Sequence, residues 1–160
     1  MRSSGRDSAL RAYVGLGANL GEREATLGRA LDLLGETPDV SVVAVSKLRD
    51  TAPVGYLDQP EFLNGAAAVE TELSPRDLLD RLLEIERELG RTRDGPRYGP
   101  RPIDLDLLAY GDRLIDEPGL TVPHPRLHER RFVLEPLAEL DPGLVVPGRG
   151  PVQALLAALD

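Results

Sequence analysis

Apolar residues recur along the chain at two spacings, which predict a mixture of strands and helices. Short runs rich in apolar, β-branched or small residues predict four strands, at 12–16, 40–48, 62–73 and 103–108. Apolar residues three and four positions apart predict amphipathic helices over 23–34 and 74–90. Between the first strand and the first helix, the glycine-containing segment 17–21 predicts a tight turn.

The last third of the chain predicts shorter elements. Gly111 and Asp112 predict a hairpin turn that returns residues 113–115 as a strand. The further predictions are an extended segment at 121–125, a helical turn at 126–131, a segment closing onto the core at 132–134, a minor strand at 144–146 and a helix at 151–159. In that last helix the residues predicted to face inward are Ala154, Leu155, Ala158 and Leu159. Together these elements predict an α+β sandwich, a mainly antiparallel sheet with helices packed on it.

Length and charge narrow the functional classes. At 160 residues the chain is expected to form one domain over residues 10–160, preceded by a loose tail at 1–9. Its net charge of −8 argues against a nucleic-acid binder. The absence of cysteine excludes disulfides and thiolate chemistry. No apolar run reaches the roughly 18 residues needed to span a membrane, and no signal-peptide core precedes the domain, so we expect a cytoplasmic protein.

The stretch 91–108, RTRDGPRYGPRPIDLDLL, carries the most informative chemistry. It begins with four arginines against one aspartate and ends in the predicted strand 103–108. On a strand Asp104 and Asp106 share one face, and the apolar residues between and beside them share the other. Carboxylates so placed suit Mg²⁺, and guanidinium groups suit phosphate oxygens. The stretch therefore predicts a Mg-nucleotide site; the alternative is a solvated acidic face with arginines that only offset the surface charge.

Within that stretch, residues 97–108 resemble the signature of the 6-hydroxymethyl-7,8-dihydropterin pyrophosphokinase family of the folate pathway. Other segments resemble further parts of the family in the same order, at 15–21, 51–55, 58–64, 85–91, 122–125 and 130–137, so that the resemblance covers about residues 12–150. The chain departs from the family pattern at Ala18, where serine is usual, and at Tyr98, where some members carry tryptophan. Leu83 stands where some members are polar, and it is assigned no ligand role.

The resemblance implies a ferredoxin-like fold and transfer of pyrophosphate from ATP to the hydroxymethyl group of a dihydropterin, with release of AMP. It implies that Asp104 and Asp106 hold two Mg²⁺ ions and that Arg91 and Arg101 neutralise charge during transfer. The residues implied to bind ATP are Glu86, Arg91, Arg93, Tyr98, Arg101, His124 and Arg130. Those implied to bind the pterin are Thr51, Ala52, Val54, Phe62, Asn64 and Phe132. Phe62 and Phe132 would sandwich the pterin ring, although core packing is the alternative for both.

Three functions are consistent with the sequence. The first is the pyrophosphokinase, expected to act as a monomer on small molecules, with the loops 49–60 and 91–101 closing over them. The second is a different Asp-x-Asp metal enzyme, such as a nucleotidyl- or glycosyltransferase, which would leave the paired phenylalanines and Asn64 unexplained. The third is a ferredoxin-like ligand-sensing module with no catalysis. Release of AMP from Mg-ATP and hydroxymethyl-dihydropterin distinguishes the first from the others.

Overall fold

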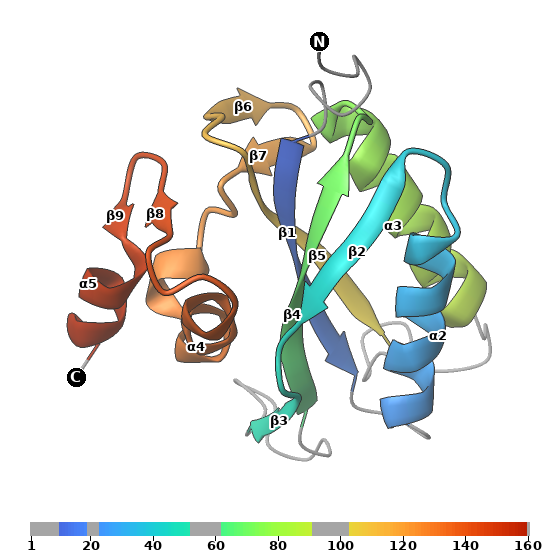
Figure 1. The fold of residues 1–160 in the computed structure, drawn as a ribbon, viewed down its shortest axis with the longest axis horizontal. Coiled ribbons are helices and arrows are strands. Elements are labelled where there is room, and N and C mark those ends of the chain that lie inside the picture. Colours follow the sequence, from blue (N-terminus) through green and yellow to red (C-terminus); the bar gives the residue numbers. More distant parts are fainter. Residues whose placement is uncertain (1–9, 19–22, 52–61, 91–102, 160) are drawn as a thin grey trace, which may run out of the picture.

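A single sheet forms the centre of the protein. The computed structural model describes residues 10–18, 23–51, 62–90 and 103–159. The strands are β1 (Leu10–Ala18), β2 (Val40–Val45), β3 (Arg49–Thr51), β4 (Phe62–Thr71) and β5 (Asp104–Tyr110). They follow the order β2-β4-β1-β5, with β3 also pairing with β4, and every pairing is antiparallel (Figure 1). The mainly antiparallel α+β fold, with the order of a ferredoxin-like sandwich, is therefore confirmed.

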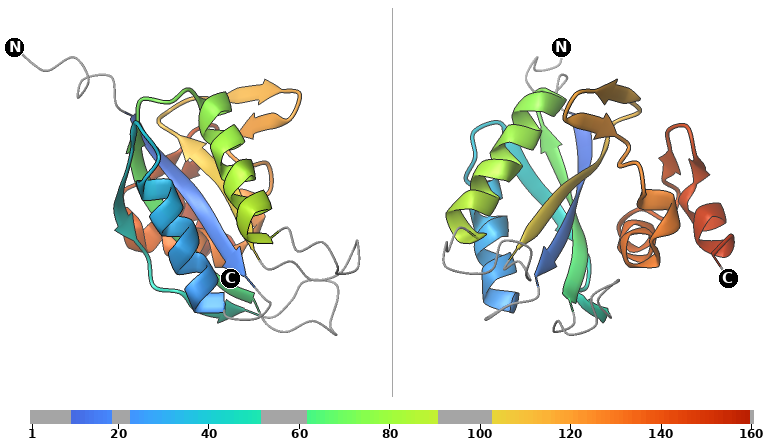
Figure 2. Two further views of the ribbon diagram at one scale, coloured as in Figure 1. Left: turned by 90° about the vertical axis from the view of Figure 1, so that its right-hand side faces the viewer. Right: turned by 180° about the vertical axis from the view of Figure 1, so that it is seen from behind.

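Two helices cover one face of this sheet. α2 (Arg23–Gly35) and α3 (Pro75–Gly90) lie side by side on that face (Figure 2). Their fully buried leucines, among them Leu27, Leu34 and Leu82, pack with Val14 and Val69 of the central strands. Both helices lie within one residue of their predicted bounds, because the spacing of their leucines directly encodes the buried face. Among the described residues, no helix is long and apolar enough to cross a membrane.

The C-terminal part of the chain covers the other face. It contains a 3₁₀ turn η1 (Leu127–Glu129), α4 (Arg131–Leu140), the small pair β8 (Val145–Val146) and β9 (Gly150–Pro151), and α5 (Val152–Ala157) (Figure 1). A second core lies here, in which Leu134 and Leu137 of α4 pack with Ala66 and Ala68 of β4. The small side chains of β4 allow α4 to approach the sheet closely.

Two predictions about strands are wrong. The turn at 110–113 exists, but β6 (Ile115–Glu117) pairs with β7 (Leu120–Val122) and not with β5. Pro118 and Gly119 link those two strands, and the φ of +77° at Gly119 is the conformation that glycine provides in a tight turn. The segment 49–51, predicted as loop, forms β3. Residues 132–134 do close onto the core as predicted, since Val133 and Leu134 are buried, and they do so within the α-helix α4, which continues through Pro136.

The terminal helix is also rotated relative to the prediction. Val152 is the fully buried residue of α5, and Leu155 and Leu156 pack partly against the second core. Ala154, Ala158 and Leu159 are exposed. The helix ends at Ala157, and β9 fixes its entry so that Val152 points inward, which the local apolar spacing could not indicate. The predicted tail at 1–9 lies outside the described residues.

Candidate active site

Two glycines of β1, Gly15 and Gly17, place no side chain on one face of the sheet. Gly17 pairs with Asn64 of β4 on one side and with Asp104 of β5 on the other, and Gly15 pairs with Asp106. A Cβ atom at Gly17 would lie 3.1 Å from the Asn64 amide nitrogen and 3.9 Å from Cβ of Asp104. The segment was predicted as a turn from Gly17 onward, but β1 continues through Ala18. Gly17 therefore leaves free space between an amide and a carboxylate.

A cavity of about 440 Å³ lies over this glycine floor. Phe62 of β4 and Phe132 of α4 line it, and both side chains are half buried. Its complete lining is Gly15, Leu16, Gly17, Phe62, Asn64, Gly65, Asp104, Asp106, Arg126, Glu129, Arg130, Phe132 and Val133. The structure thus brings together the aromatic, amide and carboxylate residues that the sequence separates by up to 70 positions.

A second cavity, of about 380 Å³, shares Asp104 and Asp106 with the first. It is also lined by Glu86, Thr121 and His124, and by the partly exposed Leu83. The two carboxylates therefore border both cavities. One cavity is lined by the two phenylalanines and Asn64, and the other by Glu86 and His124.

Glu86 fixes the strand that carries the carboxylates. β5 is an edge strand of the main sheet, so part of its main chain has no neighbouring strand. Glu86, in the last turns of α3, accepts the main-chain N–H of Leu105 at 2.7 Å. Leu105 itself is buried in the core between Asp104 and Asp106. The expected separation of faces is confirmed, since Leu105 and Leu107 enter the core while both aspartates remain half exposed.

His124 is held by a bulge in β5. Tyr13 of β1 pairs with Ala109 and the next residue pairs with Leu107, so Leu108 is an extra residue in the strand. The carbonyl of Leu108 accepts the main-chain N–H of His124 at 2.9 Å. The main-chain N–H of Arg126 donates to Nδ1 of His124 at 3.2 Å, so a neutral ring carries its proton on Nε2.

Burial lowers the pKa of His124, which the charge of Asp106 opposes and the charges of Arg130 and Arg126 reinforce. The imidazole is consequently neutral near pH 7, with Nε2–H available as a donor. Arg130, at the start of α4, lies over the ring of Phe132 at 5.6 Å from guanidinium carbon to ring centroid. A cation is thus placed next to the aromatic wall of the first cavity.

Two polar residues of the first cavity were not predicted from the sequence. Arg126 donates to Glu129 at 3.2 Å, and both border the cavity. Their only signal in the sequence was a polar helical turn, which does not indicate the cavity. The predicted ligands that lie outside the described residues are Ala52, Val54, Arg91, Arg93, Tyr98 and Arg101, with the side chain of Thr51. The main chain of Thr51 pairs with Phe62.

The described part of the chain contains no group of three or more histidine, aspartate or glutamate side chains that could enclose a metal ion. Asp104 and Asp106, two carboxylates on one half-exposed face, fit a different kind of site. Mg²⁺ commonly takes one or two protein carboxylates and completes its shell with water and substrate phosphate oxygens. The donor set is thus suited to a cation that arrives with a phosphorylated substrate.

Comparison with known proteins gives consistent matches over most of the chain. The family model described as 7,8-dihydro-6-hydroxymethylpterin-pyrophosphokinase matches residues 13–142. The chain is 49% identical over 148 residues to the 2-amino-4-hydroxy-6-hydroxymethyldihydropteridine pyrophosphokinase of Pseudomonas aeruginosa, covering 92% of this chain and 91% of that protein. It is 50% identical over 129 residues to the protein of the same name from Bacillus subtilis, covering 81% and 77%.

Longer relatives also contain this domain. The chain is 46% identical over 127 residues to the folate synthesis bifunctional protein of Arabidopsis thaliana, but spans only 26% of that protein. Among solved structures, Plasmodium falciparum HPPK-DHPS with pterin and p-hydroxybenzoate superposes with a TM-score of 0.68 at 16% identity, covering 94% of this chain and 42% of that one. At that identity the structural match supports the fold alone.

Proposed function

The chain belongs to the 7,8-dihydro-6-hydroxymethylpterin-pyrophosphokinase family, and we propose that the two cavities beside Asp104 and Asp106 hold the two substrates of its reaction. The protein transfers pyrophosphate from ATP to the hydroxymethyl group of 6-hydroxymethyl-7,8-dihydropterin in folate biosynthesis. One observation carries the assignment of the cavities: both carboxylates line both of them. A phosphate group bound through Mg²⁺ at these carboxylates would therefore be accessible from either cavity.

We assign the first cavity to the dihydropterin. Phe62 and Phe132 offer aromatic surface from different elements, which suits a flat ring. Asn64 carries both a donor and an acceptor, which suits the polar edge of a pterin. Gly17 leaves the floor between Asn64 and Asp104 open, so a ring bound at Asn64 can direct its hydroxymethyl group toward the carboxylates. Both phenylalanines are half buried and border the cavity, which supports a role in binding beside the core-packing alternative.

We assign the second cavity to ATP. His124 presents a neutral ring whose Nε2–H can donate a hydrogen bond to a phosphate oxygen. Arg130 lies at the edge of the first cavity, where its guanidinium can contact a phosphate chain that extends past the carboxylates. Arg91, Arg93 and Arg101 are proposed to bind the same phosphates, and Tyr98 to close over the nucleotide; these four lie outside the described residues.

Asp104 and Asp106 are proposed to hold two Mg²⁺ ions. Mg²⁺ bound there would supply neutralisation of the phosphate charge during transfer. The hydroxymethyl oxygen of the pterin forms a bond to the β-phosphorus, and the bond from that phosphorus to the oxygen of AMP breaks. The hydroxyl proton is released as the new ester forms. The contribution of this chain is to align the attacking oxygen and the leaving oxygen, and Glu86 supports that alignment by fixing Leu105 between the carboxylates.

The test is the identity of the products. The purified protein is mixed with Mg-ATP and 6-hydroxymethyl-7,8-dihydropterin, and AMP and pterin diphosphate are measured by chromatography. We expect equimolar AMP and pterin diphosphate, and no AMP when the pterin is omitted. Formation of ADP, a requirement for a sugar nucleotide, or binding without turnover would contradict the proposed reaction.

We also propose that the chain acts as a cytoplasmic monomer on small molecules alone. Its net charge of −8 supports the expectation that it binds no nucleic acid. Some relatives carry this domain within much longer bifunctional proteins. Sedimentation at catalytic concentrations is expected to give a mass near 17.4 kDa, and a mass twice as large would refute the monomer.

A further inference from the structure

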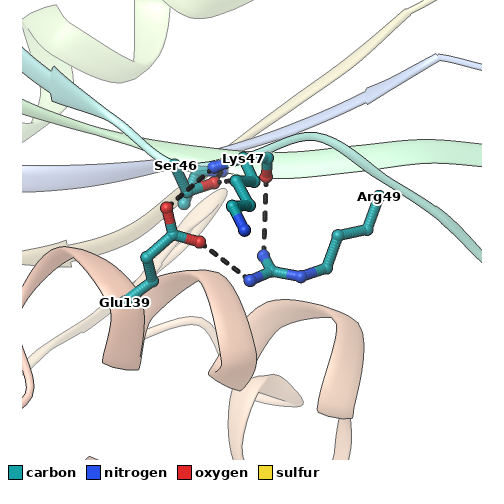
Figure 3. A network of polar contacts seen from close by, with 5 residues as sticks. Ser46, Lys47, Arg49 and Glu139 are labelled. Atoms are coloured by element: carbon teal, nitrogen blue, oxygen red, sulfur yellow. Dashed lines mark hydrogen bonds and ion pairs between the residues drawn. The ribbon is translucent and has the colours of Figure 1, made fainter.

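Glu139 joins the last turn of α4 to residues 46–49, the corner where β2 leads into β3. The main-chain N–H of Lys47 donates to one carboxylate oxygen of Glu139 at 2.9 Å, and the guanidinium of Arg49 donates to the other at 2.8 Å (Figure 3). Both oxygens are therefore engaged by the same corner. The pKa of Glu139 is lowered, chiefly by the hydrogen bond from Lys47, so the carboxylate is ionised near neutral pH.

Hydrogen bonds and close packing join this corner to β4. The main-chain N–H of Ser46 donates to the carbonyl of Ala66 at 2.9 Å, and the N–H of Ala66 donates to the Ser46 hydroxyl oxygen at 3.0 Å. Leu48 packs so closely that a Cβ atom at Gly65 would lie 2.7 Å from its Cδ2 atom. A shift of the corner would therefore be transmitted to β4.

β4 and α4 form two different walls of the first cavity. Arg49, the last residue of the corner and the first of β3, pairs with Asn64, and β3 then runs beside Phe62. Phe132 lies in the first turn of α4, seven residues before Glu139, which corresponds to about 10 Å along a helix. Glu139 lines neither cavity. It nevertheless connects the wall that carries Phe62 and Asn64 to the helix that carries Phe132.

We propose that Glu139 is a positioning residue for the dihydropterin, because it sets the separation between the Phe62 and Phe132 walls. This inference rests on the proposed function, since it takes the first cavity as the pterin site. A residue that only stabilised the fold would lower the melting temperature and leave the KM for each substrate unchanged. A positioning residue changes the affinity for one substrate and leaves the other substrate largely unaffected.

The experiment compares Glu139→Ala with the matched control Glu135→Ala. Glu135 lies one turn earlier on α4, and its ion pair, with Arg131 at 3.7 Å, is within the same helix. For Glu139→Ala we expect the KM for the dihydropterin to rise about tenfold while kcat and the KM for ATP change less than about threefold, the pattern of lost binding to one substrate. Glu135→Ala is expected to match the parent protein in all three constants.

A second variant separates geometry from folding. Glu139→Gln keeps an oxygen that can accept from Lys47 but loses the charge that binds Arg49, so its pterin KM is expected to lie between those of the parent and Glu139→Ala. If Glu139→Ala matches Glu135→Ala, or raises both KM values equally, the inference is wrong while the proposed function stands. If the parent protein itself forms no AMP, the proposed function fails and this inference fails with it.

Discussion

Replacing the carboxylates of β5 by amides is the most direct test of the site. Asp104→Asn and Asp106→Asn keep the side-chain shape but remove a negative charge from the strand that borders both cavities. Leu105 and Leu107, which alternate with them, are 3% and 5% exposed and fill the core, so neither aspartate is needed for packing. The free energy of unfolding is therefore expected to change by less than about 0.5 kcal/mol.

The effect on catalysis is expected to be much larger. A unit charge lost at about 4 Å from a cation, at an effective dielectric constant of about 20, removes about 4 kcal/mol of interaction. If that interaction acts in the transition state, the rate falls about a thousandfold. The charge of Asp106 also raises the pKa of His124, so Asp106→Asn should lower that pKa further. The change in the His124 pKa requires no bound metal, and it reports directly on the proximity of Asp106 to His124.

The assay is the initial rate of AMP formation at saturating Mg²⁺, together with a melting curve and a ¹H NMR titration of the histidines. The chain contains only two histidines, so a His124→Gln variant assigns the signal. Asp116→Asn, an exposed residue of β6 outside both cavities, is the matched control and should retain the parent rate. Rates within tenfold of the parent protein for both Asp104→Asn and Asp106→Asn would refute the metal-binding role and the central reasoning about this strand.

The remaining predictions concern Phe132 and Gly17, which border the first cavity, and Glu139. Phe132→Ala should weaken pterin binding by about 1 kcal/mol or more beyond the lost contact area and leave ATP binding nearly unchanged; a variant that unfolds more easily but binds pterin normally would show that Phe132 is a core residue. Gly17→Ala should raise the KM for the pterin, because its Cβ atom would lie only 3.1 Å from the Asn64 amide nitrogen. The control Gly28→Ala, which has open space around it, should leave this KM unchanged and stabilise α2 by about 0.5–1 kcal/mol. Equal KM values in the two variants would contradict the role of Gly17. Folding lowers the pKa of Glu139 from its usual 4.5, so the ionised carboxylate stabilises the native state above that pH. The difference in the free energy of unfolding between the parent and Glu139→Gln should disappear as the pH falls through the lowered pKa. A difference that persists in acid would show that the charge of Glu139 does not contribute to stability.

The sequence predicted well whatever depends on neighbouring residues. The two long helices and the strand with Asp104 and Asp106 were evident because apolar spacing along the chain determines which face is buried. The resemblance of residues 97–108 to a family signature also led to the correct family, which the comparisons confirm. The roles of individual side chains in that family stay predictions until the variants are measured.

The sequence did not predict structure that depends on distant partners. α4 continues through Pro136 because its apolar residues pack on the small side chains of β4. The pairing of β6 with β7 was missed for a local reason, because the turn forms at Gly119 and not at Gly111 and Asp112 alone. No pattern in the sequence relates Glu139 to Lys47, which lies 92 residues away.

By itself, the sequence determined the alternation of buried and exposed positions and the set of residue types available for chemistry. Only the tertiary structure decided that Asp104 and Asp106 border two cavities, that a bulge at Leu108 holds His124, and that Glu139 connects two walls. The physical reason is that periodicity reports which face of an element avoids water. The distance between two side chains far apart in the chain is set by how those faces pack together.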